Sequence, residues 1–156
     1  MSELSMSREE RERFLAETHV GIVSVADPGR GPLSLPVWYR YEAGGAVHFV
    51  TDADSRKVQL FRKAGRATFV VQTETPPYKY VTLEGPVVLS RDFDETREVE
   101  DLAFRYLGRE LGEQYLRMAA TEYAASESVL VTITAERWAS ADFTKMFAGP
   151  DPVGER

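Results

Sequence analysis

Several residue types and motifs that carry common chemistries are missing from this chain. Its 156 residues include no cysteine and only two histidines, His19 and His48. Disulfides, cysteine-ligated metals and thiol catalysis are therefore excluded, and the two histidines lack the spacing of a zinc motif. There is also no P-loop, no Rossmann glycine fingerprint and no G-x-S-x-G elbow. The usual signatures of nucleotide hydrolysis, dinucleotide binding and serine hydrolysis are thus absent.

Long apolar runs and an excess of positive charge are missing too. No apolar segment is long enough to span a membrane, and the first residues, MSELSMSREERERF, are too charged for a signal peptide. The net charge of -6 argues against a general nucleic-acid binder, so any basic site has to be local. We therefore predict a cytoplasmic protein with neither a nucleic acid nor a membrane as its partner.

What the sequence does contain is a series of β-like segments with a few helices between them. Alternating and β-branched patterns predict six strands, at 19–26, 33–42, 46–51, 66–74, 78–90 and 127–138. Helices are predicted from the Ser7–Glu10 capping box to about residue 17, over 55–63 before Gly65, and as a pair within 93–124 separated by Gly108. The fold class is therefore mainly β with flanking helices (α+β), with an antiparallel sheet. We expect one domain over 1–147 and a flexible tail over 148–156.

The segment 51-TDADSRK-57 is the first candidate site, because it joins a strand to the N-terminus of a helix. The first N–H groups of a helix have no partner within it, and the helix dipole favours an anion there. Arg56 and Lys57 place positive charge where the dipole disfavours it, which a bound phosphate would correct. The alternative is an ordinary helix cap at Ser55 beside a solvated surface, with Asp52 and Asp54 pairing with the cations.

Two aromatic strand segments are weaker candidates. In 34-SLPVWYRY-41, a proline beside aromatic residues leaves backbone groups free next to a flat surface that could receive a planar heterocycle. In 76-PPYKYVTLEG-85, residues of alternating type could form a pocket wall. Each segment is equally consistent with an ordinary strand. Trp138 stands at the end of the last predicted strand, where it could cover a barrel end or contact a partner subunit.

The order of these segments resembles a known family. PLSLPVWYRYE, a glycine-rich turn, VHFVTDADSRKVQLFRKAGRATFVV and then PPYKYVTLEGPV are similar to the pyridoxamine 5'-phosphate oxidase-like split β-barrel superfamily, within its group of flavin- and deazaflavin (F420)-dependent oxidoreductases. The resemblance covers roughly residues 10–145, and the T-x-x-x-S-R-K motif is its most specific part. It implies a six-stranded antiparallel split β-barrel and a homodimer with the cofactor between the subunits.

The resemblance also implies which residues bind the cofactor. Thr51, Ser55, Arg56 and Lys57 would hold the cofactor phosphate, in agreement with the anion-site interpretation of the turn. Further contacts are implied along the flavin ring and ribityl chain, on a second wall and at a closing position; these residues are Pro36, Val37, Trp38, Tyr39, Tyr80, Val81 and Trp138. Of these, Tyr39, Tyr80 and Trp138 are expected on the substrate side. No side chain is assigned as a catalytic acid or base, and no metal is expected.

The implied activity is hydride transfer from reduced F420 to a small hydrophobic or conjugated substrate. An FMN-dependent oxidoreductase on the same fold is one alternative, and a non-enzymatic flavin- or tetrapyrrole-binding protein is another. The C-terminus, GPDPVGER, lacks the Arg-Leu-x-Pro ending expected of true pyridoxamine phosphate oxidases, so vitamin B6 oxidation is not expected. For F420, whose tail is polyglutamylated, Arg62, Lys63, Arg66 and Lys79 could provide an additional basic surface.

Overall fold

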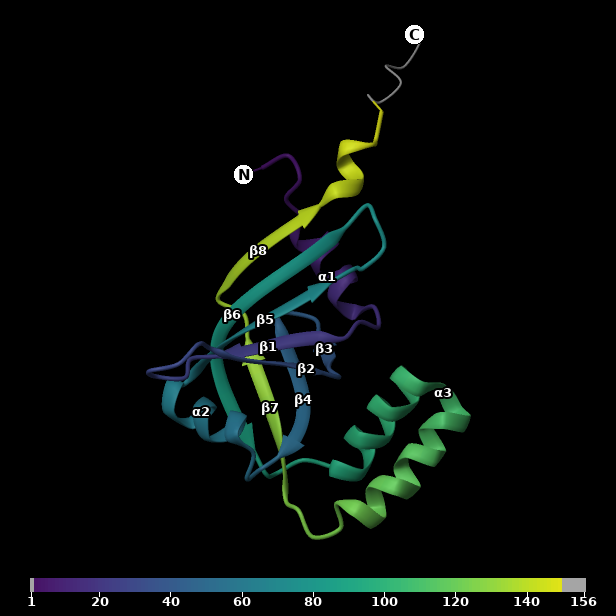
Figure 1. Cartoon of the computed structure of the whole chain (residues 1–156). Coiled ribbons are helices and arrows are strands. Elements are labelled where there is room, and N and C mark those ends of the chain that lie inside the picture. The colour runs from purple at the N-terminus through teal and green to yellow at the C-terminus, as the bar shows by residue number, and fades with distance from the viewer. Residues whose placement is uncertain (1, 150–156) are drawn as a thin grey trace.

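The computed structural model describes residues 2–149, which form eight strands, three α-helices and a short 3₁₀ helix (Figure 1). The tail predicted over 148–156 lies outside the described residues except for its first two positions. The strands are β1 (Gly21–Val25), β2 (Leu33–Val37), β3 (Arg40–Glu42), β4 (Ala46–Asp52), β5 (Arg66–Gln72), β6 (Lys79–Ser90), β7 (Ser128–Thr134) and β8 (Arg137–Asp142). The helices are α1 (Arg8–Ala16), α2 (Arg56–Ala64), α3 (Glu95–Glu122) and the 3₁₀ helix η1 (Phe143–Met146).

All the strand pairs are antiparallel, in the order β2-β1-β5-β6-β7-β4-β3, with β8 on the other edge of the long strand β6. Two strands that are consecutive in the chain, β2 and β3, therefore stand at opposite ends of this order. The sheet curls so that these two ends come together, and residues Trp38–Tyr39 are the short chain segment that connects β2 to β3 (Figure 1). This arrangement confirms the predicted class. The strand count is eight instead of six. The segment predicted at 33–42 breaks into β2 and β3, and the segment predicted at 127–138 contains β7 and only the start of β8, whose residues 139–142 were not predicted as strand.

Local sequence explains where the helices begin and end. Ser7 caps α1 through the predicted box, since its hydroxyl accepts from the Glu10 N–H and the Glu10 carboxylate accepts from the Ser7 N–H. Gly65 ends α2 in the left-handed region, at φ 69°, as expected for a glycine C-cap. Gly108, at φ 74° and ψ -174°, divides α3 into the two predicted helical arms.

One hydrophobic core lies inside the curled sheet. Strands β1, β4, β5, β6 and β7 contribute alternate residues to it, and α1 and α2 add buried side chains that include Phe14, Leu15, Val58 and Phe61. Helix α3 projects away from the sheet as a helical hairpin (Figure 1). Among the described residues, no helix is long and apolar enough to cross a membrane.

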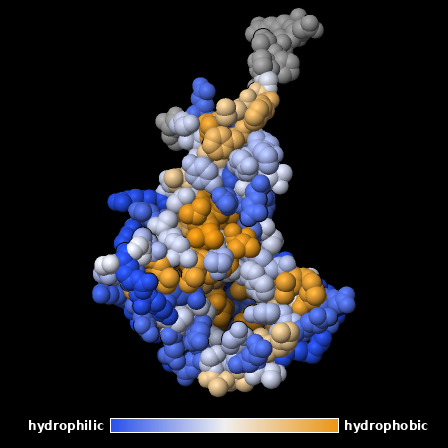
Figure 2. Space-filling view, viewed as in Figure 1, coloured by the Kyte–Doolittle hydropathy of each residue, from blue (hydrophilic) through white to orange (hydrophobic). Residues whose placement is uncertain are grey.

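The outer face of the sheet formed by β2, β1, β5, β6 and β8 carries two distinct rows of side chains. Registered neighbours in the first row are uncharged and mostly apolar: Pro36, Ile22, Val70, Thr82 and Ala139. Registered neighbours in the second row are polar: Ser34, Ser24, Thr68, Glu84 and Arg137. Figure 2 shows hydrophobic side chains gathered at the centre of this face, over the positions of β1 and β5. This outer surface thus changes from apolar to polar along the strands.

Candidate functional site

The start of α2 has hydrogen-bonding groups without partners. Ser55 is the N-cap, but its side chain makes no capping hydrogen bond. Its Oγ atom is buried, and no hydrogen-bond partner reaches it within residues 2–149. A buried hydroxyl without a partner is costly, so this atom is a candidate to bind a ligand atom. The first turn of α2 also contains no acidic residue that would satisfy the helix dipole.

Lys57 adds a partly buried positive charge to this turn. Burial lowers the pKa of Lys57 from its ordinary value, and the negative charge of Asp52 opposes this shift only in part. No carboxylate in the described part of the chain lies within ion-pair distance of Lys57. Removing a cation from water without pairing it is unfavourable. The position therefore favours a negatively charged ligand.

The other residues of the turn, Thr51 and Arg56, differ in whether their side chains already have partners. Arg56 is half-exposed and donates from Nη2 to Oδ2 of the buried Asp27, at 2.6 Å. Thr51 is partly buried near the end of β4, opposite Val129 of β7. The four predicted phosphate ligands thus lie within one strand-to-helix turn. Two of them, Ser55 and Lys57, have no partner within the described chain, whereas Arg56 already has one.

The segment predicted to lie along a flavin ring divides between the surface and the core. Pro36 is exposed on the outer face, and Val37 packs against the core. The Tyr39 ring is fully buried, and its hydroxyl donates to the Leu15 carbonyl at 2.8 Å. Burial raises the pKa of Tyr39 well above its usual value. The expected substrate-side contact of Tyr39 does not fit this structure, because its ring is needed to fill the core.

The remaining member of that segment, Trp38, packs against α3. Its ring stacks on Tyr106 with centroids 5.2 Å apart and an interplanar angle of 6°, and it also contacts Tyr115. The Tyr106 hydroxyl accepts from the Tyr39 N–H at 3.1 Å and lies 2.5 Å from the His19 carbonyl oxygen. Tyr106 therefore fixes the β2–β3 corner. Sequence analysis did not identify Tyr106, because its partners lie far away along the chain and no local signal points to them.

The residues predicted for the second wall and the closing position, Tyr80, Val81 and Trp138, also divide between the surface and the interior. Tyr80 is about one-third exposed, on the outer face, whereas Val81 points inward and is buried in the core. Trp138 lies in β8, faces inward and packs beneath α1, with the Arg11 guanidinium 4.8 Å from the ring centroid. Of these three residues, only Tyr80 is presented on the same face as Pro36.

The turn over residues 51–57, called the phosphate turn below, and Trp138 lie at opposite ends of β4. The turn follows the last residues of this strand, whereas Trp138 approaches Gly45, directly before its first residue. A seven-residue antiparallel strand spans about 20 Å. One chain therefore does not bring Trp138 and Lys57 to a common small site. A site containing both would need either a long ligand or two chains.

The described residues fit the phosphate end of a cofactor. Ser55 supplies a buried hydroxyl without a partner, Lys57 supplies an unpaired cation, and the start of α2 supplies free backbone N–H groups. From this end, the outer face of β1 and β2 continues through Ser24 and Ser34, whose hydroxyl oxygens are 2.8 Å apart, to the apolar row. Charged, polar and apolar surfaces thus follow one another in space, which suits a ligand with a phosphate, a polar linker and a flat ring.

Comparisons with known proteins agree with this fold. A conserved hypothetical protein from Mycobacterium tuberculosis superposes with a TM-score of 0.71 at 22% identity, covering 99% of this chain and 96% of that one. A FAD-binding protein from Mesorhizobium loti gives 0.64 at 19% identity, with 87% and 94% covered. A protein described as F420 reductase gives 0.57 at 17% identity, with 82% and 94% covered. These identities are low, so the three structures show a shared fold.

The sequence itself supports a family assignment. No curated protein matches it. A sequence model of the family described as pyridoxamine 5'-phosphate oxidase, however, matches residues 7–138, which include the phosphate turn, the outer-face strands and Trp138. This chain therefore belongs to the pyridoxamine 5'-phosphate oxidase-like family of split β-barrels.

Proposed function

We propose that this protein binds a flavin-type cofactor and uses it as an oxidoreductase, with F420 as the preferred cofactor and a small hydrophobic or conjugated molecule as the substrate. One observation carries the proposal: the start of α2 combines the buried, unpartnered Ser55 hydroxyl with the partly buried, unpaired Lys57. A phosphate group would satisfy both and would also complement the helix dipole. The family assignment and the relatives described as an F420 reductase and a FAD-binding protein support a flavin-type cofactor in general.

The residues of the chain have binding and orienting roles in this proposal. Ser55 donates its hydroxyl proton to a phosphate oxygen, and Lys57 neutralises the phosphate charge. Arg56, held by Asp27, adds positive potential at the rim of the turn. Pro36 and Tyr80 face outward on β2 and β6, with β1 and β5 between them, so a ring would lie over the apolar row that includes Ile22 and Val70. The bound cofactor supplies the hydride chemistry, and the protein supplies orientation and electrostatics.

The choice between F420 and FMN depends on what lies beyond the phosphate. F420 carries a polyglutamylated tail that a basic surface would favour. Arg62 and Lys63 are exposed in the last turn of α2, without a carboxylate partner among the described residues. Arg66 pairs with Glu136, and Lys79 lies 3.7 Å from Asp142, so these two cations are less available. Two of the four expected basic residues therefore support F420, and FMN remains the alternative cofactor.

A homodimer is part of the same proposal. Trp138 of the same chain stands at the opposite end of β4 from the phosphate turn and faces inward beneath α1, so Trp138 is not among the proposed cofactor contacts, and two copies would meet through the outer face of the sheet instead. The uncharged row on the outer face, which includes Ile22 and Val70, gives two copies an apolar surface on which to meet. Two protomers could then enclose one cofactor between them.

Titration of the purified protein with F420 and, separately, with FMN tests the proposal through quenching of cofactor fluorescence. We expect F420 to bind more tightly. Lys57→Gln should weaken binding at least tenfold, because losing a charged hydrogen bond typically costs about 1.5–3 kcal/mol. Arg117→Gln, which removes an exposed cation on α3, should bind F420 as tightly as the unmodified protein does and serves as the matched control.

Three other outcomes would change the conclusion. Tighter FMN binding would make the FMN-dependent oxidoreductase the leading function. Tight binding without substrate reduction in a screen with the reduced cofactor would favour a non-enzymatic flavin- or tetrapyrrole-binding protein. If neither cofactor binds, or if Lys57→Gln binds as tightly as the unmodified protein, the turn is a plain helix cap and the proposal fails.

A further inference from the structure

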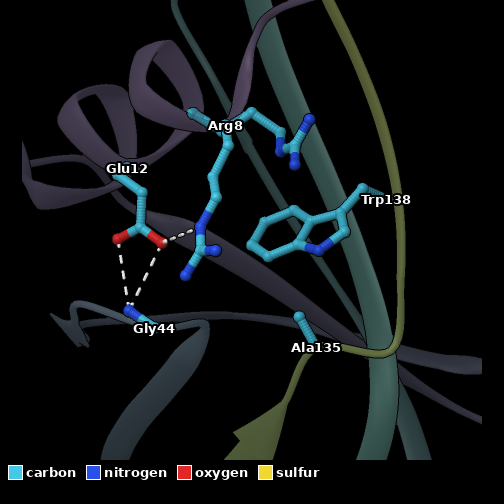
Figure 3. A pocket seen from close by; sticks show the side chains of 6 residues that line it. Arg8, Glu12, Gly44, Ala135 and Trp138 are labelled. Carbon is cyan, nitrogen blue, oxygen red and sulfur yellow. Dashed lines mark hydrogen bonds and ion pairs between the residues drawn. The ribbon is translucent and has the colours of Figure 1, made fainter.

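A cavity lies beneath α1, away from the phosphate turn. It has a volume of about 280 Å³ and opens between the helix, the β3–β4 turn and the start of β8 (Figure 3). The residues that line it are Arg8, Arg11, Glu12, Gly44, Ala135 and Trp138. In Figure 3, Arg8 and Glu12 come down from the helix toward the turn, and the Trp138 ring forms the opposite wall.

The charges around this cavity do not cancel. The Glu12 carboxylate accepts from the Gly44 N–H, with both oxygens at 3.3 Å, and Arg8 Nε lies 3.9 Å from it. Arg11 donates from Nη1 to the Met6 carbonyl at 3.1 Å, and no carboxylate within residues 2–149 lies in ion-pair range of it. One negative charge therefore faces two guanidinium groups. The cavity retains an excess positive charge at Arg11.

Arg11 also has a donor without an acceptor. Its Nε atom is buried and makes no hydrogen bond to the described part of the protein. Buried guanidinium N–H groups are rarely left unpaired, because the lost hydration is not recovered. The guanidinium carbon stands 4.8 Å from the centroid of the Trp138 ring, so this cation–π contact holds the group in position while its Nε remains free.

We propose that this cavity is a binding site for a small planar carboxylate, such as an aromatic acid of one ring. The carboxylate would accept from Arg11 and from the half-paired Arg8, and the ring would pack against the Trp138 indole. A volume of 280 Å³ is below the usual range for drug-sized ligands, so it suits a single ring with its acid group. The site is separate from the phosphate turn, since Trp138 adjoins the opposite end of β4, and it does not depend on the proposed cofactor.

Amide-resolved NMR titration of the full chain with benzoate tests this site, and benzamide serves as the matched neutral probe. We expect benzoate to shift the Gly44 amide and the Trp138 indole N–H, with saturation, and benzamide to have at least tenfold lower affinity. Arg11→Gln should abolish the difference between the two probes. Arg11→Lys, which keeps the charge but not the planar guanidinium, should retain only part of it. Arg13→Gln, an exposed change on the same helix, should bind as the unmodified protein does.

Two results would overturn the proposal. One is equal affinity for benzoate and benzamide, which would mean that no cation recognises the acid group. The other is benzoate shifts centred on Ser55 and Lys57, which would place the acid at the phosphate turn. A thermal melt of each variant identifies any loss of folding. The two proposals can fail separately. If neither F420 nor FMN binds the protein, benzoate should still shift the Gly44 amide and the Trp138 indole N–H.

Discussion

Two serines at the starts of helices have opposite relations to their own helices. Ser7 caps α1 through reciprocal hydrogen bonds with Glu10, whereas the Ser55 side chain makes no hydrogen bond to α2. The same residue type at the same helical position therefore serves stability in the first case. In the second case, the hydroxyl has no hydrogen-bond partner among the described residues.

This contrast predicts different costs for the same substitution. Ser7→Ala should lower the free energy of unfolding by about 1 kcal/mol, the usual cost of losing an N-cap. Ser55→Ala should cost much less, because no capping bond is lost, and it should weaken cofactor binding instead. Urea unfolding of both variants, together with cofactor titration, measures the two effects. A larger stability loss at Ser55 than at Ser7 would mean that the Ser55 hydroxyl has a structural partner.

Prediction from the sequence was most successful where the signal is local. The Ser7 box and the glycines at 65 and 108 depend only on neighbouring residues, and all three were predicted. The inward positions of Tyr39 and Val81 were not distinguished from outward ones, because both sequence segments mix aromatic and apolar residues on both faces. The sequence alone does not single out Arg11, since its contact with Trp138 joins segments that are far apart in the chain.

At the scale of elements, the first arm of α3 is fastened to the sheet more firmly than the second. Arg40 makes a bidentate ion pair with Glu98 at 2.7–3.1 Å, and Arg105 donates to the Ala16 and Glu17 carbonyls. Beyond Gly108, the second arm presents an exposed stripe that consists of Leu111, Tyr115 and Met118. The first arm therefore sets the position of Trp38, and the second adds one contact to it.

Tyr106 should be the residue on which this docking depends. Tyr106→Phe keeps the stacking on Trp38 but removes the hydroxyl that serves the Tyr39 N–H and the His19 carbonyl, which should cost about 1–3 kcal/mol. Tyr115→Phe is the matched control and should change stability by less than about 0.5 kcal/mol. Chemical denaturation compares them. Equal effects at the two positions would show that the Tyr106 hydroxyl does not hold the β2–β3 corner.

The breaks within the strands were the main features missed at this scale. The segments at 33–42 and 127–138 each carry a continuous β-like pattern, so each was predicted as one strand. The breaks at Trp38–Tyr39 and at Ala135–Glu136 change the neighbours of the chain: β2 pairs with β1 and β3 with β4, while β7 pairs with β4 and β6, and β8 with β6 alone. Which strands pair depends on the whole sheet, and the alternation of residues along one segment does not predict its partners.

At the scale of the whole molecule, the proposed homodimer can be tested on the apolar row. Light scattering after size-exclusion chromatography should give twice the 17.6 kDa chain mass. Ile22→Glu, at a partly exposed position in this row, should shift the protein toward the monomer because it places a charge in each apolar contact surface. Met118→Glu, an exposed change on α3, should remain dimeric. An unmodified protein that elutes as a monomer, or equal masses for the two variants, would contradict this interface.

The beginning and the end of the described chain are joined by direct contacts. Met6 N–H donates to the Ser140 hydroxyl, Asp142 N–H to the Leu4 carbonyl, and Lys145 pairs with Glu10. Ribosomes add about 5–20 residues per second. Residues 4–10 therefore wait on the order of ten seconds for the partners that lie some 135 positions later. During synthesis, α1 can already pack on β3 and β6, but the segment that precedes it reaches its final partners only after β8 and the start of η1 have emerged.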